Sequence, residues 1–100
     1  MKKVMVLFQR HGSAWDPEKA VRAQAFWDDH ARFVDALYAQ GKILLAGPFA
    51  DGSGSLVVLN VDSPEEARAA FHDDPWAKRD ILVAADVKEW TIFLDGRDRI

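Results

Sequence analysis

The 100-residue chain lacks cysteine and contains no long hydrophobic run. Without cysteine it can form no disulfide, thiolate metal site or cysteine nucleophile. No stretch approaches the roughly 20 apolar residues of a membrane-spanning helix. The apolar run after Lys2 and Lys3 covers only residues 4–8, shorter than the about 7–15 residues of a signal peptide's hydrophobic region. We therefore expect a cytoplasmic protein with no membrane partner.

The sequence also lacks a basic face and the motifs of metal and cofactor sites. Its 13 Lys and Arg against 16 Asp and Glu give a net charge of −3, whereas nucleic acid binding relies on clustered basic residues. The three histidines do not have metal-ligand spacing. Gly12–Ser13 forms neither a phosphate-binding loop nor a nucleophile elbow. We expect no nucleic acid, no metal and no cofactor.

A long amphipathic helix is predicted over residues 16–41. Asp16 suits the N-cap, Pro17 suits the first helical position, and Gly41 suits the position just past the end. Apolar residues recur between them at three- and four-residue steps, at Ala23, Phe26, Trp27, Phe33, Val34 and Leu37. His30 falls within this stripe, so its side chain is expected to face the core or a cleft rather than water.

The remaining elements are four strands and shorter helices. Alternating or continuous apolar residues predict strands over 3–10, 42–49, 55–61 and 85–94, with a hairpin loop at 50–54, a short helical turn at 77–82 and a polar tail at 95–100. The Gly47–Pro48 break indicates a sheet edge or a bulge, because proline lacks a ladder donor. Ser63 and Glu66 form a capping box at the start of a helix that ends around His72. The order βαββαβ predicts one α+β domain over 1–100: a ferredoxin-like, four-stranded antiparallel sheet with helices on one face.

The strands are apolar on both faces, although the helices can cover only one. A half-exposed antiparallel sheet normally alternates apolar with polar residues. The side chains concerned include Val4, Val6 and Phe8 on one face and Met5 and Leu7 on the other, with Trp90, Ile92 and Leu94 in the last strand. We expect a second copy of the chain to cover the open sheet face, which makes the protein a homodimer.

His30 and Asp74 are the candidate catalytic residues. Imidazole, with an unperturbed pKa of about 6.5, suits proton transfer at neutral pH, and a carboxylate often orients it. Asp74 stands where the second helix ends, and Pro75 holds it in an extended conformation. Asp73 is expected to be solvated. The alternative for His30 is a core histidine bonded to a backbone carbonyl.

Four tryptophans are the other signal. Trp15 and Trp76 are expected in loops near helix ends, where they either plug the core or form an apolar wall beside His30 for a flat substrate. Trp27, three residues before His30, is expected to line the same pocket.

Five segments together resemble the YciI-like (YCII-related) domain family over about residues 4–94. They are HARFVDAL from His30, GKILLAGP from Gly41, SPEEA, DDPW and VKEWTI. The resemblance implies a dimeric α+β barrel of ferredoxin-like subunits and an active site with a histidine and an aspartate. Those positions match His30 and Asp74, with Gly47–Pro48 lining the same cleft.

The resemblance also bears on function. A related enzyme eliminates chloride from a chlorinated hydroxyhydroquinone, and the wider superfamily includes muconolactone isomerases and cofactor-free monooxygenases. We therefore predict a cofactor-independent enzyme that uses His30 and Asp74 for isomerisation, elimination or dehydrochlorination of a small cyclic or aromatic compound. The alternatives are a non-catalytic dimer that binds a small ligand or regulates, and a purely structural dimer.

Overall fold

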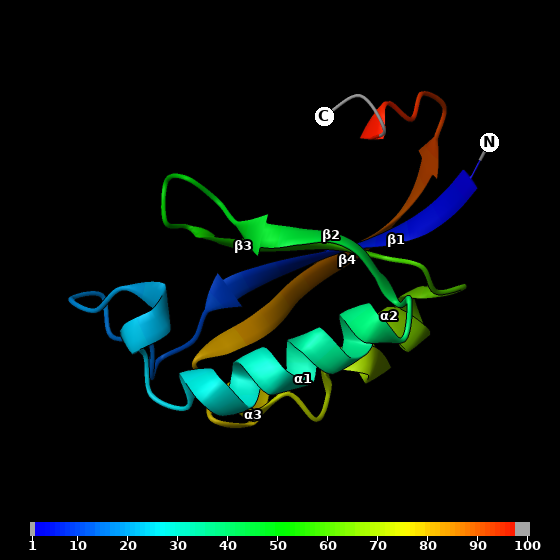
Figure 1. Cartoon of the computed structure of the whole chain (residues 1–100). Coiled ribbons are helices and arrows are strands. Elements are labelled where there is room, and N and C mark those ends of the chain that lie inside the picture. The colour runs from blue at the N-terminus through cyan, green and yellow to red at the C-terminus, as the bar shows by residue number, and fades with distance from the viewer. Residues whose placement is uncertain (1, 98–100) are drawn as a thin grey trace.

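Four antiparallel strands form one sheet in the computed structural model of the chain, which describes residues 2–97 (Figure 1). The order across the sheet is β2-β3-β1-β4. The strand bounds are β1 Lys2–His11, β2 Ile43–Pro48, β3 Gly54–Leu59 and β4 Leu82–Ile92. This arrangement confirms the predicted α+β, ferredoxin-like fold.

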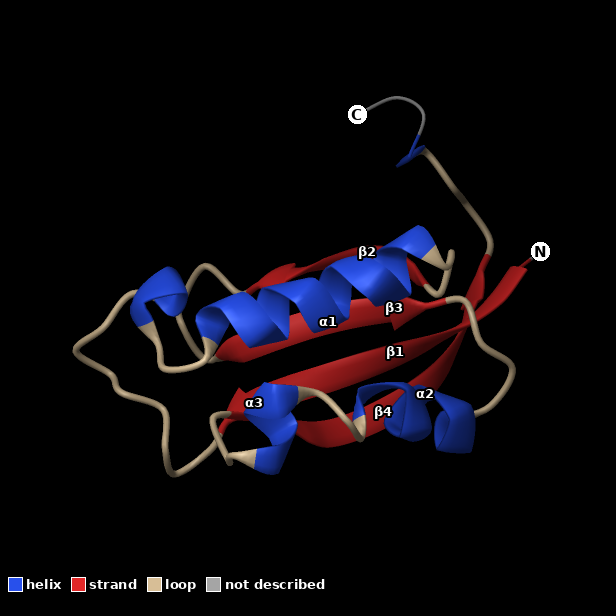
Figure 2. Ribbon diagram, turned by 60° about the horizontal axis from the view of Figure 1, so that its bottom comes forward, coloured by secondary structure: helices blue, strands red, loops and turns tan. Residues whose placement is uncertain are grey.

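The helices lie on one face of the sheet, as expected (Figure 1). They are α1 Trp27–Ala39, α2 Pro64–Phe71 and α3 Pro75–Lys78, and a 3-10 turn, η1 Val21–Ala23, precedes α1. Figure 2 shows α1 over the β2–β3 half of the sheet and α2 with α3 over the β1–β4 half. Within residues 2–97 no helix has both the length and the apolar character needed to cross a membrane.

The hydrophobic core lies between the helices and the sheet. Met5 and Leu7 of β1 are fully buried on the helix face, where they belong to one core cluster with residues of β2, β3, α1 and α2. These partners are Leu37, Ile43, Val57, Leu59, Ala67 and Phe71. Because side chains alternate along a strand, Val4 and Val6 belong to the opposite face. The period-two pattern therefore assigned both faces of β1 correctly.

The predicted start of the long helix is wrong by about ten residues. The helix begins at Trp27, and Asp16 does not cap it. Instead, the Asp16 carboxylate accepts the backbone N–H of Glu18 at 3.0 Å, which is an Asx turn rather than a helix cap. Residues 12–26 thus form a loop with one short 3-10 turn.

Local bonds of Gln24 and one long-range bond of Trp76 hold this loop out of the helix. The buried Gln24 side chain donates to the carbonyls of Asp16 (2.7 Å) and Lys19 (3.0 Å) and accepts from the Asp16 N–H (2.9 Å). The Trp76 indole N–H donates to the Ala25 carbonyl at 2.7 Å. Phe26 then adopts a positive φ of 62°, a conformation that a helix does not continue through.

The predicted end of α1 is confirmed. Gly41 has a φ of 78°, its N–H donates to the Tyr38 carbonyl, and the Lys42 N–H donates to the Leu37 carbonyl. These two bonds form a Schellman motif, in which glycine is favoured because it has no Cβ. The chain then enters β2 at the sheet edge, where Pro48 needs no ladder donor. The irregularity in β2 lies between Ile43 and Leu45, not at Gly47–Pro48.

Helix α2 starts as predicted, and the segment after it differs from the prediction. Ser63 accepts the Glu66 N–H at 3.1 Å, while the Glu66 carboxylate accepts the N–H of Asp62. The short helix covers Pro75–Lys78 rather than residues 77–82, because Asp74 caps it and Pro75 is its first residue. Trp76 therefore sits in a helix, not in a loop. Of the predicted polar tail, residues 98–100 lie outside the described part of the chain.

Candidate active site

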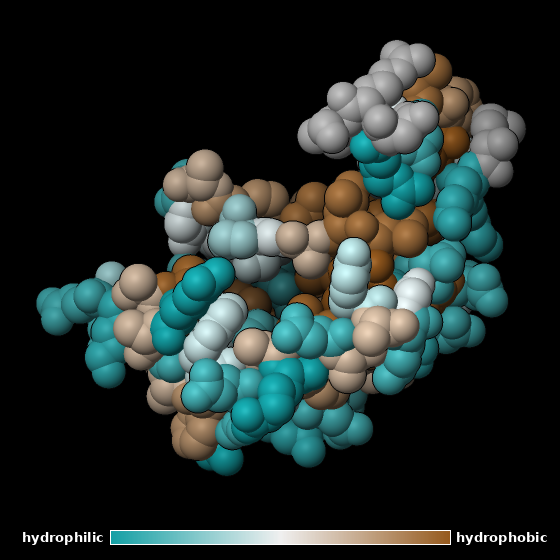
Figure 3. Space-filling view, viewed as in Figure 1, coloured by the Kyte–Doolittle hydropathy of each residue, from teal (hydrophilic) through white to brown (hydrophobic). Residues whose placement is uncertain are grey.

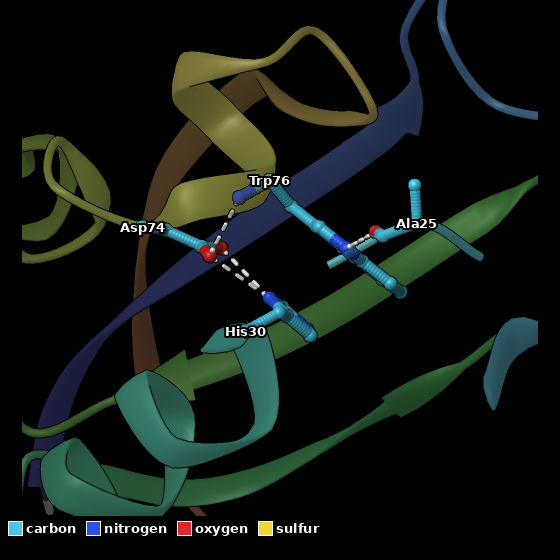
Figure 4. A network of polar contacts seen from close by, with 4 residues as sticks. All are labelled: Ala25, His30, Asp74 and Trp76. Atoms are coloured by element: carbon cyan, nitrogen blue, oxygen red, sulfur yellow. Dashed lines mark hydrogen bonds and ion pairs between the residues drawn. The ribbon is translucent and has the colours of Figure 1, made fainter. Parts of the chain in front are cut away.

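His30 and Asp74, 44 positions apart in sequence, are in direct contact (Figure 4). The His30 Nδ1 atom lies 2.9 Å from Asp74 Oδ1 and 3.0 Å from Asp74 Oδ2. His30 comes from the first turn of α1, and Asp74 from the junction between α2 and α3. Both residues are buried, and the Asp74 side chain is 0% exposed. The structure thus forms the pair that the sequence could only suggest.

Asp74 has two roles in this geometry. Its Oδ1 also accepts the backbone N–H of Trp76 at 3.1 Å, which caps α3 and fixes the carboxylate. A carboxylate only accepts hydrogen bonds, so the His30 proton resides on Nδ1 and donates to Asp74. The Nε2 lone pair is then available as a proton acceptor. Within residues 2–97, Nε2 has no hydrogen-bond partner, and the atom is not fully buried.

Aromatic rings fix the plane of the imidazole. Trp76, which is 1% exposed, stacks on His30 with ring centroids 3.9 Å apart and an interplanar angle of 6°. The indole itself is held by its hydrogen bond to Ala25, as Figure 4 shows. Trp27 lies 5.8 Å from His30 and 5.6 Å from Trp76, centroid to centroid. Stacking and the two bonds to Asp74 leave the ring little freedom to turn.

A cavity of about 380 Å³ opens beside His30. It collects all the substrate-binding residues predicted from sequence, namely Trp15, Trp27, Gly47, Pro48 and Trp76. Asp74 does not line it, because Asp74 lies behind the imidazole. Trp15 meets Trp76 edge-on at 5.7 Å and stacks on His11 at 3.8 Å. The structure places these residues together, and their roles in catalysis and binding stay predictions.

Three polar residues of the cavity wall were not predicted. Gln9 and His11 of β1 and Ser55 of β3 line it from the sheet side. One signal could have found Gln9 and His11. They continue the inward-facing alternation of Met5 and Leu7, where an apolar residue is expected. A polar residue at an inward strand position indicates either a buried partner or a site.

The loop that carries Trp15 is tied to Asp80. The Gly12 N–H donates to the Ile81 carbonyl and the Ala14 N–H to the Asp80 carbonyl, both at 2.9 Å. The Ser13 hydroxyl and backbone N–H both donate to the Asp80 carboxylate. These hydrogen bonds, that of the hydroxyl first, hold the pKa of Asp80 below its ordinary value. The wall of the cavity formed by His11 and Trp15 is thereby anchored to the segment after α3.

His72 and Asp73, next to Asp74 in sequence, lie on the surface. Asp73 is exposed, as predicted, and contacts His72 and Lys78. Its pKa is lowered, first by the hydrogen bond with His72 and then by the charge of Lys78. In the part of the chain that the structure describes, no three His, Asp or Glu side chains are grouped as metal ligands.

The fold is a ferredoxin-like α+β domain with a histidine–aspartate pair beside a cavity. The chain belongs to the YCII-related domain family, whose sequence profile matches residues 3–91. This confirms the resemblance found in the sequence.

Two similar proteins illustrate the family and the fold. The uncharacterized protein YjpA of Bacillus subtilis (strain 168) is 40% identical over 63 residues, which are 63% of this chain and 67% of YjpA. The solved structure of 5-chloro-2-hydroxyhydroquinone dehydrochlorinase (TftG) from Burkholderia phenoliruptrix AC1100, in complex with 2,5-dihydroxybenzoquinone, has a TM-score of 0.58 and 23% identity. The match covers 87% of this chain and 93% of TftG, and it shows a shared fold.

Proposed function

We propose that the protein is a cofactor-independent enzyme in which His30 transfers a proton to and from a small cyclic or aromatic substrate. One observation carries this proposal: the buried Asp74 carboxylate holds His30 Nδ1 at 2.9 Å while the same imidazole lines the cavity. A histidine that served only the core would have no reason to keep Nε2 accessible beside a cavity. Membership of the YCII-related domain family supports the same assignment.

In the proposed mechanism, Nε2 accepts a proton from the bound substrate. The resulting imidazolium is stabilised by Asp74, whose negative charge lies against Nδ1. The substrate anion then either loses a leaving group, which is an elimination, or takes the proton back at another atom, which is an isomerisation. Positioned acid–base catalysis of this kind contributes about 10²–10⁴-fold, enough for a substrate whose proton is already acidic.

Elimination of chloride from a chlorinated, hydroxylated ring is the reaction to test first. The TftG structure is described as a dehydrochlorinase with a bound dihydroxybenzoquinone, and it shares this fold. The aromatic wall formed by Trp15, Trp27 and Trp76 suits a flat ring, because stacking and apolar burial both favour it. A volume of about 380 Å³ is of the size that small-molecule sites have.

We further propose that the working unit is a homodimer joined through the open sheet face. Apolar side chains gather on the side of the sheet away from the helices (Figure 3). Leu45 and Trp90 are 49% and 48% exposed there, and Val58 lies between them in the wall of the same hollow. A second copy that packs sheet against sheet would remove this surface from water.

The experiment is to incubate the protein with 5-chloro-2-hydroxyhydroquinone under anaerobic conditions and to measure released chloride. Wild-type protein should release chloride, and His30→Ala should not, while circular dichroism shows both to be folded. Undiminished turnover by His30→Ala would contradict the proposal.

A different result would separate the non-catalytic possibilities. If the ring binds without reacting and His30→Gln keeps the affinity, the cavity is a binding site. If no ring binds and His30→Ala only lowers stability, by about 1–3 kcal/mol, the histidine is structural.

A further inference from the structure

Gln9 is a buried polar side chain for which residues 2–97 provide no hydrogen-bond partner. It is 7% exposed and lies on the helix face of β1, directly after the core residues Met5 and Leu7. Residues 2–97 supply no hydrogen bond to its amide. In the same residues, every side-chain nitrogen or oxygen atom that is fully buried does have a hydrogen-bond partner. The amide atoms must therefore reach the surface of a hollow. A mostly buried side chain that presents a free donor and a free acceptor to a hollow is placed to bind a ligand there.

Two hollows adjoin Gln9. One is the cavity beside His30, and the other lies between α2, α3 and β4 and is bordered by Arg68 and Lys78. The neighbours of Gln9 favour the first. Ser55 stands directly opposite Gln9 in the β1–β3 ladder and lines only the cavity. Cβ atoms of directly opposite residues are about 4.5–5.5 Å apart, so the Gln9 amide and the Ser55 hydroxyl belong to the same part of this wall.

The charge of the cavity wall restricts the ligand. Among the described residues that line it there is no Lys, Arg, Asp or Glu, and the only titratable side chains are His11 and His30. A carboxylate or a phosphate would find no permanent cation there, and burying an unpaired charge is unfavourable. An uncharged or weakly acidic molecule avoids that cost. A primary amide both donates and accepts, so it can bind a hydroxyl or a carbonyl oxygen.

We infer that Gln9 determines specificity by binding a hydroxyl or carbonyl oxygen of the substrate ring, with Ser55 beside it and His30 facing the ring from α1. The inference rests on the proposed function and names the class of substrate: an oxygen-substituted ring without a fixed negative charge. Gln9 takes no part in the proton transfer itself. Its effect lies in which rings are bound and how they are oriented toward Nε2.

The test compares two probes that differ by one hydroxyl, 1,4-hydroquinone and phenol. Quenching of tryptophan fluorescence reports binding, because Trp15, Trp27 and Trp76 line the cavity. Wild-type protein should prefer hydroquinone by about tenfold, the value of one or two hydrogen bonds. Gln9→Leu should lose this preference while phenol binding is unchanged. Gln40→Leu, which changes an exposed glutamine at the end of α1, should behave as wild type.

Each other outcome has a definite meaning. If wild type prefers hydroquinone and Gln9→Leu keeps the full preference, the inference is wrong and the proposed function stands. If benzoate binds wild type as well as hydroquinone does, selection against fixed charge is wrong. If wild type binds neither ring, the proposed function fails and the inference falls with it. Should Gln9→Leu not fold, Gln9→Glu, which keeps the shape and the acceptor but loses the donor, must still alter the preference.

Discussion

The two faces of the sheet carry different kinds of side chain. Of the buried polar residues, Gln9, His30 and Asp74 lie on the helix side of the sheet, and Gln24 lies in the loop before α1. The open face instead presents apolar side chains such as Leu45 and Trp90. Buried polar groups need partners at defined distances and directions, whereas apolar surface is attracted to any apolar surface. This difference is why we propose catalysis on the helix face and association through the open face.

The largest expected effect is on turnover and comes from Asp74→Asn. An asparagine can still accept the Trp76 N–H and cap α3, but its amide would donate to Nδ1 and leave the proton on Nε2. The imidazole then could not act as a base. We expect initial rates of chloride release to fall by roughly 10²–10⁴-fold. Asp73→Asn, at the exposed neighbouring position, is the matched control and should keep the wild-type rate.

The next largest effect is on dimerisation and tests the open face alone. Trp90→Glu places a charge in the middle of the open face, and loss of a central tryptophan typically costs an interface about 2–4 kcal/mol. Analytical ultracentrifugation should show a dimer for wild type and a dissociation constant raised by roughly 30–1,000-fold for the variant. Tyr38→Glu, on the exposed side of α1, should stay dimeric. A monomeric wild type would refute the proposed interface.

A smaller effect concerns the loop that anchors the cavity wall. A Cβ on Gly12 would collide with the Asp80 carbonyl oxygen, so Gly12→Ala must displace the loop. Overpacking of this kind costs about 1–3 kcal/mol in the free energy of unfolding, which urea titration measures. Gly47→Ala, with no atom near the added methyl group, should change stability by less than about 0.5 kcal/mol. Equal stability of the two variants would contradict the described loop contacts.

The smallest effect is a pH dependence. Hydrogen bonds from Ser13 lower the pKa of Asp80 in the folded protein, so the carboxylate stabilises the fold above its unfolded pKa of about 3.9. That contribution is lost as the pH falls through the lower, folded pKa. Asp80→Asn tolerates the positive φ of 56°, keeps one acceptor oxygen for Ser13 and removes the charge. The melting temperature of the variant should fall less than that of wild type as the pH is lowered from 6 to 2.

The sequence predicted the features that depend on residues close to one another in the chain. Gly41 ends α1 through its own conformation, and Ser63 begins α2 through a bond to a residue three positions away. The alternation of apolar residues assigned the faces of β1. Each of these features depends on neighbours along the chain, which the sequence displays.

The start of α1 depends on contacts that the sequence does not display. Asp16–Pro17 is a typical helix start, but no helix begins there. The Gln24 side chain binds the Asp16 carbonyl, and the Trp76 indole binds the Ala25 carbonyl, so these groups do not form helical hydrogen bonds. Trp76 is 51 positions from Ala25. The contact between His30 and Asp74 is equally long-range. Residue type and sequence position identified both residues as candidates, but only the folded structure shows that His30 Nδ1 lies 2.9 Å from Asp74 Oδ1.

The position of the proton on the His30 imidazole, read from nitrogen chemical shifts in wild type and in Asp74→Asn, tests the central claim most directly. A carboxylate only accepts hydrogen bonds, so the wild-type proton should reside on Nδ1, whereas the asparagine amide should donate to Nδ1 and leave the proton on Nε2. The exposed His72 should keep the same tautomer in both proteins and serve as the internal control. The same His30 proton position in both proteins would mean that the two side chains are not in contact in solution, and the acid–base function would lose its basis.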